Sequence, residues 1–173
     1  MFIKMIGAII VFSSCTFMGF FMAYKDKFRA EELFEMKRAL TMLKSAVLNS
    51  SKPLYEAFIE ISEKVDSAVS EIFEDAGRMM KSRQTSTALE AWEKTLKDRK
   101  SRTYFKNEDI DAFLSFGQAL GGDDCEWQVS NIDMTIGYIN TKTEELLKKN
   151  TKDSRLFKSA GVLCGVLLIV MLY

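Results

Sequence analysis

Three neighbouring carboxylates have the spacing in this sequence that best suits metal chemistry. Asp123, Asp124 and Glu126 follow one another closely, and carboxylate oxygens are the ligands that Ca²⁺ and Mg²⁺ prefer. The same spacing has a structural explanation, because an aspartate followed three residues later by a glutamate is typical of the start of a helix. We expect Asp123 to cap a helix without binding a metal, and a metal-dependent membrane enzyme is the weaker interpretation.

The chain contains no histidine and only three cysteines. The lack of histidine excludes Ser-His and Cys-His nucleophile pairs as well as histidine metal ligands. Cys15, Cys125 and Cys164 do not form a disulfide framework, and reduced thiols fit a cytosolic domain. We predict that the protein is not an enzyme, and that it takes no cofactor and no small-molecule substrate.

A glycine pattern, Gly117-x-x-x-Gly121-Gly122, is the second feature that suggests chemistry. It resembles part of a phosphate-binding loop, but no strand precedes it and no Lys-Ser or Lys-Thr pair follows. We instead expect Gly117 to admit a neighbouring helix at close range. Gly121 is predicted to end its helix in the left-handed conformation.

Basic residues crowd a predicted loop at residues 97–107. Arg99, Lys100 and Arg102 lie close to Tyr104 and Phe105, and basic residues interleaved with aromatics are typical of nucleic-acid-binding proteins. The formal net charge of the chain is +0, so no wider basic surface supports a nucleic-acid partner. We predict a solvated loop with one or two rings in the core, whose three cations dock an acidic face of a partner protein.

Two hydrophobic runs frame the chain. Residues 5–24 are uncharged, and a helix of that length spans the bilayer core of about 30 Å. Bulky residues at its end disfavour a cleaved signal peptide, and a lipoprotein signal at Cys15 is the alternative. Residues 159–173 are uncharged but reach only about 22 Å, so a half-inserted tail is the alternative to a second span. Gly161 and Gly165 have the spacing for close helix packing in a membrane.

Basic residues flank the central segment on both sides, and the positive-inside rule places that segment in the cytosol. We therefore predict a two-pass cell-membrane protein. Its parts are an N-terminal transmembrane helix at residues 1–25, a cytosolic helical bundle at 26–155 and a C-terminal transmembrane helix at 156–173. The flanking cations are Lys25, Lys27, Arg29, Lys148, Lys149, Lys152, Arg155 and Lys158.

Apolar periodicity predicts an all-α bundle of about six helices. Its first and last helices should pair antiparallel and continue into the membrane helices. Pro53 fits the first residue of the second helix, and Thr87-x-x-Glu90 has the form of a capping box. Trp92 shares the apolar stripe of the fourth helix, so we predict a core anchor. The two long apolar seams comprise Leu33, Met36, Leu40, Leu43 and Val47, and Val129, Ile132, Ile136, Ile139, Thr143 and Leu146.

Several short stretches occur in order along nearly the full length: Arg38-Ala39-Leu40-x-x-Leu43, Pro53-Leu54-x-Glu56-Ala57, Glu90-Ala91-Trp92, Phe116-Gly117-x-x-Leu120-Gly121-x-Asp123, Gln128 with Ile132, and Leu156-x-x-Ser159-x-Gly161-Val162-Leu163-x-Gly165. Together they resemble the stage III sporulation protein AB family of endospore-forming bacteria. The chain departs from the family at residues 44–49, where family members often carry acidic residues and a tyrosine.

The resemblance implies a fold similar to the cytosolic helical domain of the type II secretion F platform proteins. It also implies a place in the channel-like complex between mother cell and forespore, with a cytosolic ATPase and other channel components as partners. The residues by themselves predict a membrane-anchored scaffold that docks partners through helices. A general membrane-tethered adaptor or receptor unrelated to sporulation is the alternative.

Overall fold

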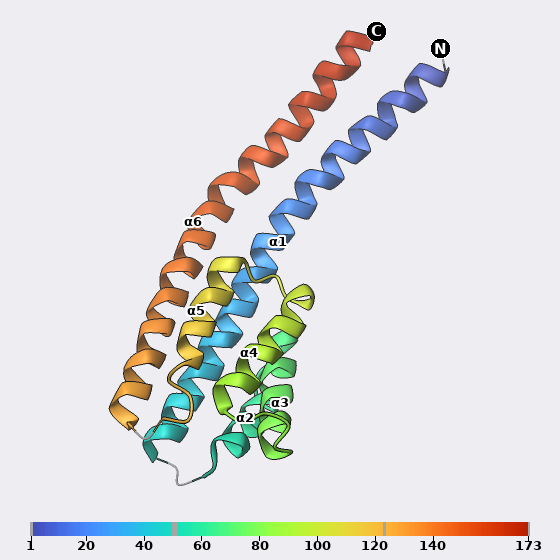
Figure 1. Cartoon of the computed structure of the whole chain (residues 1–173). Helices are drawn as coiled ribbons and strands as arrows, with labels where there is room; N and C mark the ends of the chain where they lie inside the picture. Colours follow the sequence, from blue (N-terminus) through green and yellow to red (C-terminus); the bar gives the residue numbers. More distant parts are fainter. Residues whose placement is uncertain (1, 50–51, 123, 173) are drawn as a thin grey trace. The chain divides into compact units, whose positions relative to one another are not determined.

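The structure, a computed structural model, describes the backbone of residues 2–49, 52–122 and 124–172. It describes the side chains of residues 24–49, 52–122 and 124–148. The described residues form six α-helices and one 3-10 helix, which confirms the predicted all-α fold (Figure 1). The elements are α1 (Phe2–Asn49), α2 (Leu54–Ser62), α3 (Ser67–Lys81), α4 (Ala88–Arg99), η1 (Lys100–Arg102), α5 (Asn107–Gly117) and α6 (Cys125–Leu172).

The chain divides into two compact units. One contains Met1–Phe28 and Glu144–Tyr173, and the other is the helical domain Arg29–Thr143. Among the residues whose side chains are described, no helix has an apolar stretch that could cross a membrane. The predicted spans at residues 5–24 and 159–173 lie outside those residues except for Tyr24, as do the side chains of Cys15 and Cys164.

The starts of α2 and α6 each differ by one residue from the sequence-based expectation. Pro53 is the cap residue before α2. Its ψ of 145° is non-helical, while its carbonyl already accepts a hydrogen bond from the helical amide of Ala57 at 3.3 Å. Asn107 is the first residue of α5, and Lys106 takes the capping position. Asp124 caps α6, where its Oδ1 accepts the amides of Glu126 and Trp127 at 2.9 and 3.1 Å. Asp123 lies outside the described residues.

The cap of α4 confirms the sequence signal. Thr87 Oγ1 accepts the amide of Glu90 at 3.1 Å. The Glu90 carboxylate in turn accepts the amide of Ser86 at 2.8 Å, one residue before the position of a strict capping box. Gly121 has a φ of +75°, the left-handed conformation that the sequence predicted. The helix itself ends earlier than predicted, because α5 stops at Gly117 and a turn leads to Gly121.

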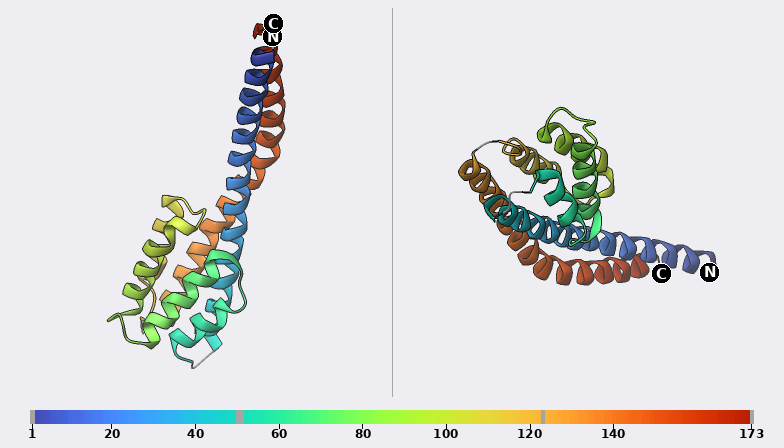
Figure 2. Two further views of the ribbon diagram at one scale, coloured as in Figure 1. Left: turned by 90° about the vertical axis from the view of Figure 1, so that its right-hand side faces the viewer. Right: turned by 90° about the horizontal axis from the view of Figure 1, so that it is seen from below.

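Within the helical domain, α1 and α6 lie side by side and antiparallel (Figures 1 and 2). Lys44 Nζ on α1 contacts the Asp133 carboxylate on α6 at 2.7 Å. Further along α1, the Val47 carbonyl accepts from Cys125 Sγ at 3.8 Å, at the start of α6. The first seam is buried at Leu33, Met36, Leu40 and Leu43, and the last seam at Ile132 and Ile139. The predicted antiparallel pairing is confirmed.

Trp92 is the centre of the core. Its side chain is fully buried, and its ring lies 5.3 to 5.8 Å from the rings of Phe58, Phe73 and Phe116. A Cβ at Gly117 would lie 2.5 Å from Trp92 Cδ1, so only glycine leaves room for the indole between α4 and α5. The structure confirms that Trp92 is a core anchor and that Gly117 permits close helix packing.

Candidate docking surface

Arg99, the first of the three predicted docking cations, is engaged inside the domain. Its guanidinium forms an ion pair with Asp75 at 2.6 Å and a second ion pair with Glu71. Both carboxylates lie on α3, one turn apart, and α3 packs against α4. The sequence analysis placed Arg99 in a loop as a docking cation, but Arg99 is the last residue of α4 and its charge is already paired. The sequence does not show which helix packs beside it.

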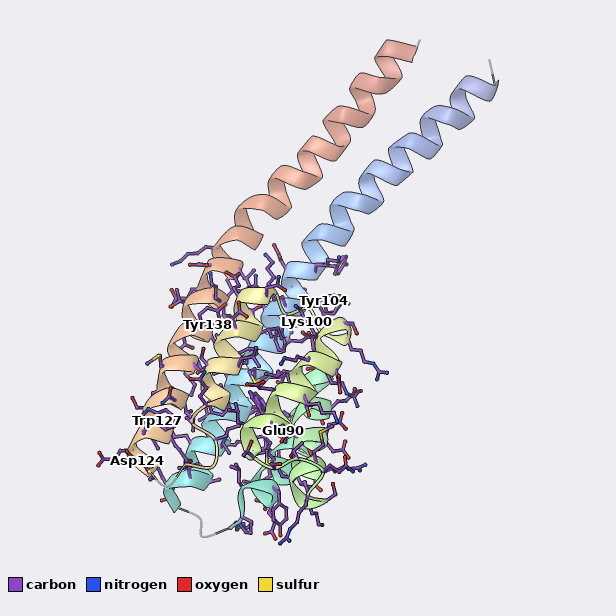
Figure 3. All side chains as sticks on the ribbon, in the orientation of Figure 1. Glu90, Lys100, Tyr104, Asp124, Trp127 and Tyr138 are labelled. Atoms are coloured by element: carbon purple, nitrogen blue, oxygen red, sulfur yellow. The ribbon has the colours of Figure 1, made fainter. Side chains whose placement is uncertain are left out.

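Lys100 and Arg102 lie on the surface of the domain. Arg102 is 3.8 Å from the Glu71 carboxylate, with its side chain 68% exposed, and such long exposed pairs contribute little stability. Lys100 is exposed and has no ion-pair partner among the residues that the structure describes. Figure 3 shows Lys100 and Tyr104 at the same end of the domain. Lys100 and Arg102 therefore offer positive charge to a partner.

The two rings of this loop have different environments. Phe105 is buried, and its ring meets that of Phe113 at 5.1 Å. Tyr104 is 43% exposed. The expectation of one or two rings in the core is confirmed by Phe105, while Tyr104 adds an aromatic surface next to the cations.

A buried ion-pair network joins α1, α5 and α6. Arg29 donates from Nε and Nη2 to the two oxygens of Asp109, each at 2.8 Å, and from Nη2 to Glu108 at 2.8 Å. The Tyr138 hydroxyl donates to Asp109 at 2.8 Å, and Lys142 lies 3.4 Å from Glu108. Arg29 and Asp109 are almost completely buried. A buried pair of this kind fixes the register of the helices that carry it, because each charge needs its partner.

The network shifts the pKa values of its members in the directions that its contacts require. Burial opposes the charge on Arg29, but hydrogen bonds to Asp109 and Glu108 outweigh it and raise the arginine pKa. The Arg29 hydrogen bond lowers the pKa of Glu108. Burial and the hydrogen bond to Asp109 raise the pKa of Tyr138. The shifts of Arg29 and Glu108 both favour the charged forms of these residues at neutral pH.

Sequence reasoning missed this network. Arg29 was interpreted as one of the basic residues that flank a membrane helix. Asp109 is in the first turn of α5, where its position along the chain explains it as a favourable charge at a helix start. Both interpretations use only neighbouring residues, whereas the pair joins positions 80 residues apart. The available signal was weak: an arginine one turn before Leu33, on the apolar face of its helix.

A second buried carboxylate lies near the basic loop. Glu32 on α1 is 6% exposed, and its Oε2 accepts the backbone amide of Tyr104 at 2.7 Å. Burial raises the Glu32 pKa to about 7, although the amide hydrogen bond opposes the shift. Glu32 thus ties the loop that carries Lys100 and Arg102 to α1.

The candidate metal ligands do not assemble in the described part of the chain. Asp124 is engaged as the cap of α6, and no group of three potential ligands is present among the described residues. Asp123 lies outside them. Gly161 and Gly165 lie beyond the residues whose side chains and surroundings are described, so their packing in a membrane stays a prediction.

Comparison with known proteins gives the family. The sequence profile of stage III sporulation protein AB matches residues 4–173. The chain belongs to the stage III sporulation protein AB family. This confirms the resemblance found in the sequence, and it assigns the protein a role related to sporulation.

One relative matches the chain in sequence, and one solved structure matches it in fold. The stage III sporulation protein AB of Bacillus subtilis (strain 168) is 25% identical over 170 residues, which cover 98% of this chain and 99% of the relative. A solved structure of a stage III sporulation protein AB matches with a TM-score of 0.67 at 20% identity, covering 71% of this chain and 96% of that chain. At this identity the structural match shows the fold alone.

Proposed function

We propose that this member of the stage III sporulation protein AB family is a membrane-anchored scaffold in a secretion-like channel complex needed for endospore formation. The observation that carries the proposal is the construction of α1 and α6. Each is a continuous helix of 48 residues, and each contributes one end to the buried core of the domain. The other ends contain the uncharged runs at residues 5–24 and 159–173.

A helix of this length supports two tasks at once. At 1.5 Å per residue each extends about 72 Å, whereas a bilayer core needs only about 30 Å. The remaining turns can carry a domain outside the bilayer. In the proposed arrangement the chain passes the membrane twice, with residues 26–155 in the cytosol, on the mother-cell side. The basic flanks of that segment support this orientation.

The proposed scaffold acts through its surface, where Lys100, Arg102 and Tyr104 form the candidate docking surface. Two cations beside an exposed aromatic ring fit an acidic face of a cytosolic partner, and the ATPase of the channel complex is the partner that we propose. Such contacts mainly set the encounter rate and its dependence on salt. Arg99 has a different role: its ion pairs with Glu71 and Asp75 hold the end of α4 against α3.

The test is crosslinking in the native membrane. A photoreactive amino acid replaces Lys100 in the full-length chain, which is produced during sporulation and illuminated in intact cells. The expected products contain a secretion-type ATPase or neighbouring channel proteins. A matched chain with the same amino acid at exposed Glu63 is the control. Products limited to unrelated proteins, identical at both positions, would contradict the proposal and favour a general membrane-tethered adaptor.

A further inference from the structure

An exposed tryptophan with acidic neighbours marks the outer side of α6. Trp127 is 45% exposed, and Figure 3 shows it with Asp124 at the start of α6, at the edge of the domain opposite α4. Asp124 and Glu126 are exposed, and residues 107–141 contain no lysine or arginine. Glu126 has no ion-pair partner within the described ranges. A large apolar side chain that is partly exposed beside carboxylates is costly to leave in water and suits an interface.

A hollow of opposite character lies at the end of α3. This open pocket has a volume of about 510 Å³ and is lined by Asp75, Arg78, Met79, Lys81, Ser82 and Gln84. Met79 gives it an apolar wall, and Arg78 pairs with Glu74 at 2.5 Å at its rim. Lys81 and the adjacent Arg83 are exposed. Neither has a carboxylate partner in the part of the chain that the structure describes, whereas the carboxylate of the lining, Asp75, is paired with Arg99. The charge left without a partner at this end of α3 is therefore positive.

The two surfaces cannot meet within one chain. Both belong to the helical domain Arg29–Thr143. In that domain α6 lies on one side and α3 on the other, with α1 and α5 between them (Figures 1 and 2). A contact between the acidic start of α6 and the pocket of α3 therefore requires two copies.

We propose that copies of this chain associate by inserting Trp127 of one copy into the α3 pocket of the next. The indole ring lies against the Met79 thioether and the Arg78 guanidinium, two groups that bind aromatic rings favourably. Glu126 and Asp124 face Lys81 and Arg83. Because two different surfaces meet, the contact is heterologous. A pair of copies therefore still has one unoccupied α3 pocket and one Trp127 that is not inserted. Repetition of the contact builds a ring or a row of domains.

A second copy is the occupant that the chain itself specifies. Every copy presents both an apolar projection beside the exposed carboxylates of Asp124 and Glu126 and an apolar hollow beside the exposed cations of Lys81 and Arg83. Opposite charges speed their encounter, and like charges disfavour a symmetric contact of two α6 starts. The proposal is independent of the docking surface at Lys100 and Arg102, which lies at the other end of α4 from the loop that carries Arg83.

The test is an isotope-mixing crosslink on the full-length chain. Cys15→Ser and Cys164→Ser leave the exposed Cys125 as the one thiol. Unlabelled and ¹⁵N-labelled copies are mixed equally in detergent and treated with a reagent that joins a cysteine to a lysine. The expected product is a mixed-isotope link between Cys125 and Lys81. Trp127→Ser should lower its yield by about tenfold or more, as for the central aromatic of an interface.

A charge exchange makes the assignment specific. Glu126→Arg copies alone and Arg83→Glu copies alone should each lose the link, because like charges then face one another. Mixing the two variants should restore it, from Cys125 of the first to Lys81 of the second. Glu63→Arg, an exposed reversal outside both surfaces, should leave the link unchanged. A folded chain without mixed-isotope links, links that avoid Lys81, links undiminished by Trp127→Ser, or a failed restoration would overturn the proposal.

Discussion

The indole Nε1 of Trp92 donates a hydrogen bond to the carbonyl oxygen of Phe113 at 2.7 Å. This bond satisfies the only polar atom of a fully buried side chain, and it joins α4 to α5. It also positions the ring over Gly117, where a Cβ would meet Trp92 Cδ1. The close packing of α4 on α5 therefore depends on this hydrogen bond, on the aromatic contacts of Trp92 and on the lack of a side chain at Gly117.

Truncation of the central tryptophan should destabilise the domain strongly. Trp92→Ala removes contacts with three phenylalanine rings, and deep aromatic truncations cost about 3–5 kcal/mol. Thermal or urea unfolding of the full-length chain measures the loss. Trp127→Ala is the matched control, since that exposed side chain should contribute much less. Equal stability losses in the two variants would contradict the description of the core.

Two glycine substitutions should have opposite effects. Gly117→Ala forces a shift of the Trp92 ring and should destabilise the domain by about 1–3 kcal/mol, the usual effect of overpacking. Gly137→Ala meets nothing within 4 Å and should stabilise α6 by up to about 1 kcal/mol through helix propensity. The measurement is the free energy of unfolding of each variant relative to the original chain, which should decrease for Gly117→Ala and increase for Gly137→Ala. A neutral Gly117→Ala would show that α4 and α5 separate easily.

Breaking the buried ion pair should cost more than breaking an exposed one. Arg29→Ala leaves the fully buried Asp109 without its guanidinium partner, and such losses typically cost about 3–5 kcal/mol. Lys44→Ala, which breaks the surface pair with Asp133, should cost less than about 1 kcal/mol. Urea unfolding of both variants tests this. Similar small losses would mean that the network adds no constraint between α1 and α5.

Glu32 should make stability depend on pH. Its pKa is about 7 in the folded protein, against 4.5 for an unperturbed glutamate such as that of the unfolded chain. The folded state therefore holds the extra proton between these values, and stability should fall as pH rises through this window. The total effect is on the order of 3 kcal/mol.

Glu32→Gln keeps an acceptor for the Tyr104 amide and removes the titration. This variant should be more stable than the original chain at pH 8 and should show a flatter stability profile between pH 5 and pH 7.5. Glu63→Gln, at an exposed position, is the control and should leave the profile unchanged. Parallel profiles for the Glu32→Gln chain and the original would contradict the assignment.

Charge reversal on the docking surface should weaken partner capture without unfolding the domain. Lys100→Glu with Arg102→Glu changes exposed residues that contribute little stability, so the helical content should stay the same. Capture of the ATPase from sporulating cells should decrease, most strongly at low salt, where electrostatic contacts are least screened. Arg99 is not substituted, because its ion pairs with Glu71 and Asp75 contribute to the packing of α4 on α3. Undiminished capture at low salt would exclude this surface.

The sequence by itself determined the local structure and much of the core. Periodic apolar residues indicated the helices and the buried side of each, including Trp92. Gly121 revealed a left-handed turn, and the order of short motifs indicated the family. Each of these features depends on residues only a few positions apart in the chain, so it can be predicted from the sequence without knowing which helices pack together.

Only the tertiary structure decided which charges meet. Arg29 and Asp109 lie 80 positions apart, and Arg99 and Asp75 lie 24 positions apart. Either arginine could equally have faced solvent, a membrane surface or a partner, because periodicity places a residue on a face of its helix but does not select the helix packed against it. That selection depends on the simultaneous burial of several apolar faces. The pairing of Arg99, a contact that no local pattern encodes, consequently reduced the candidate docking surface from three cations to two.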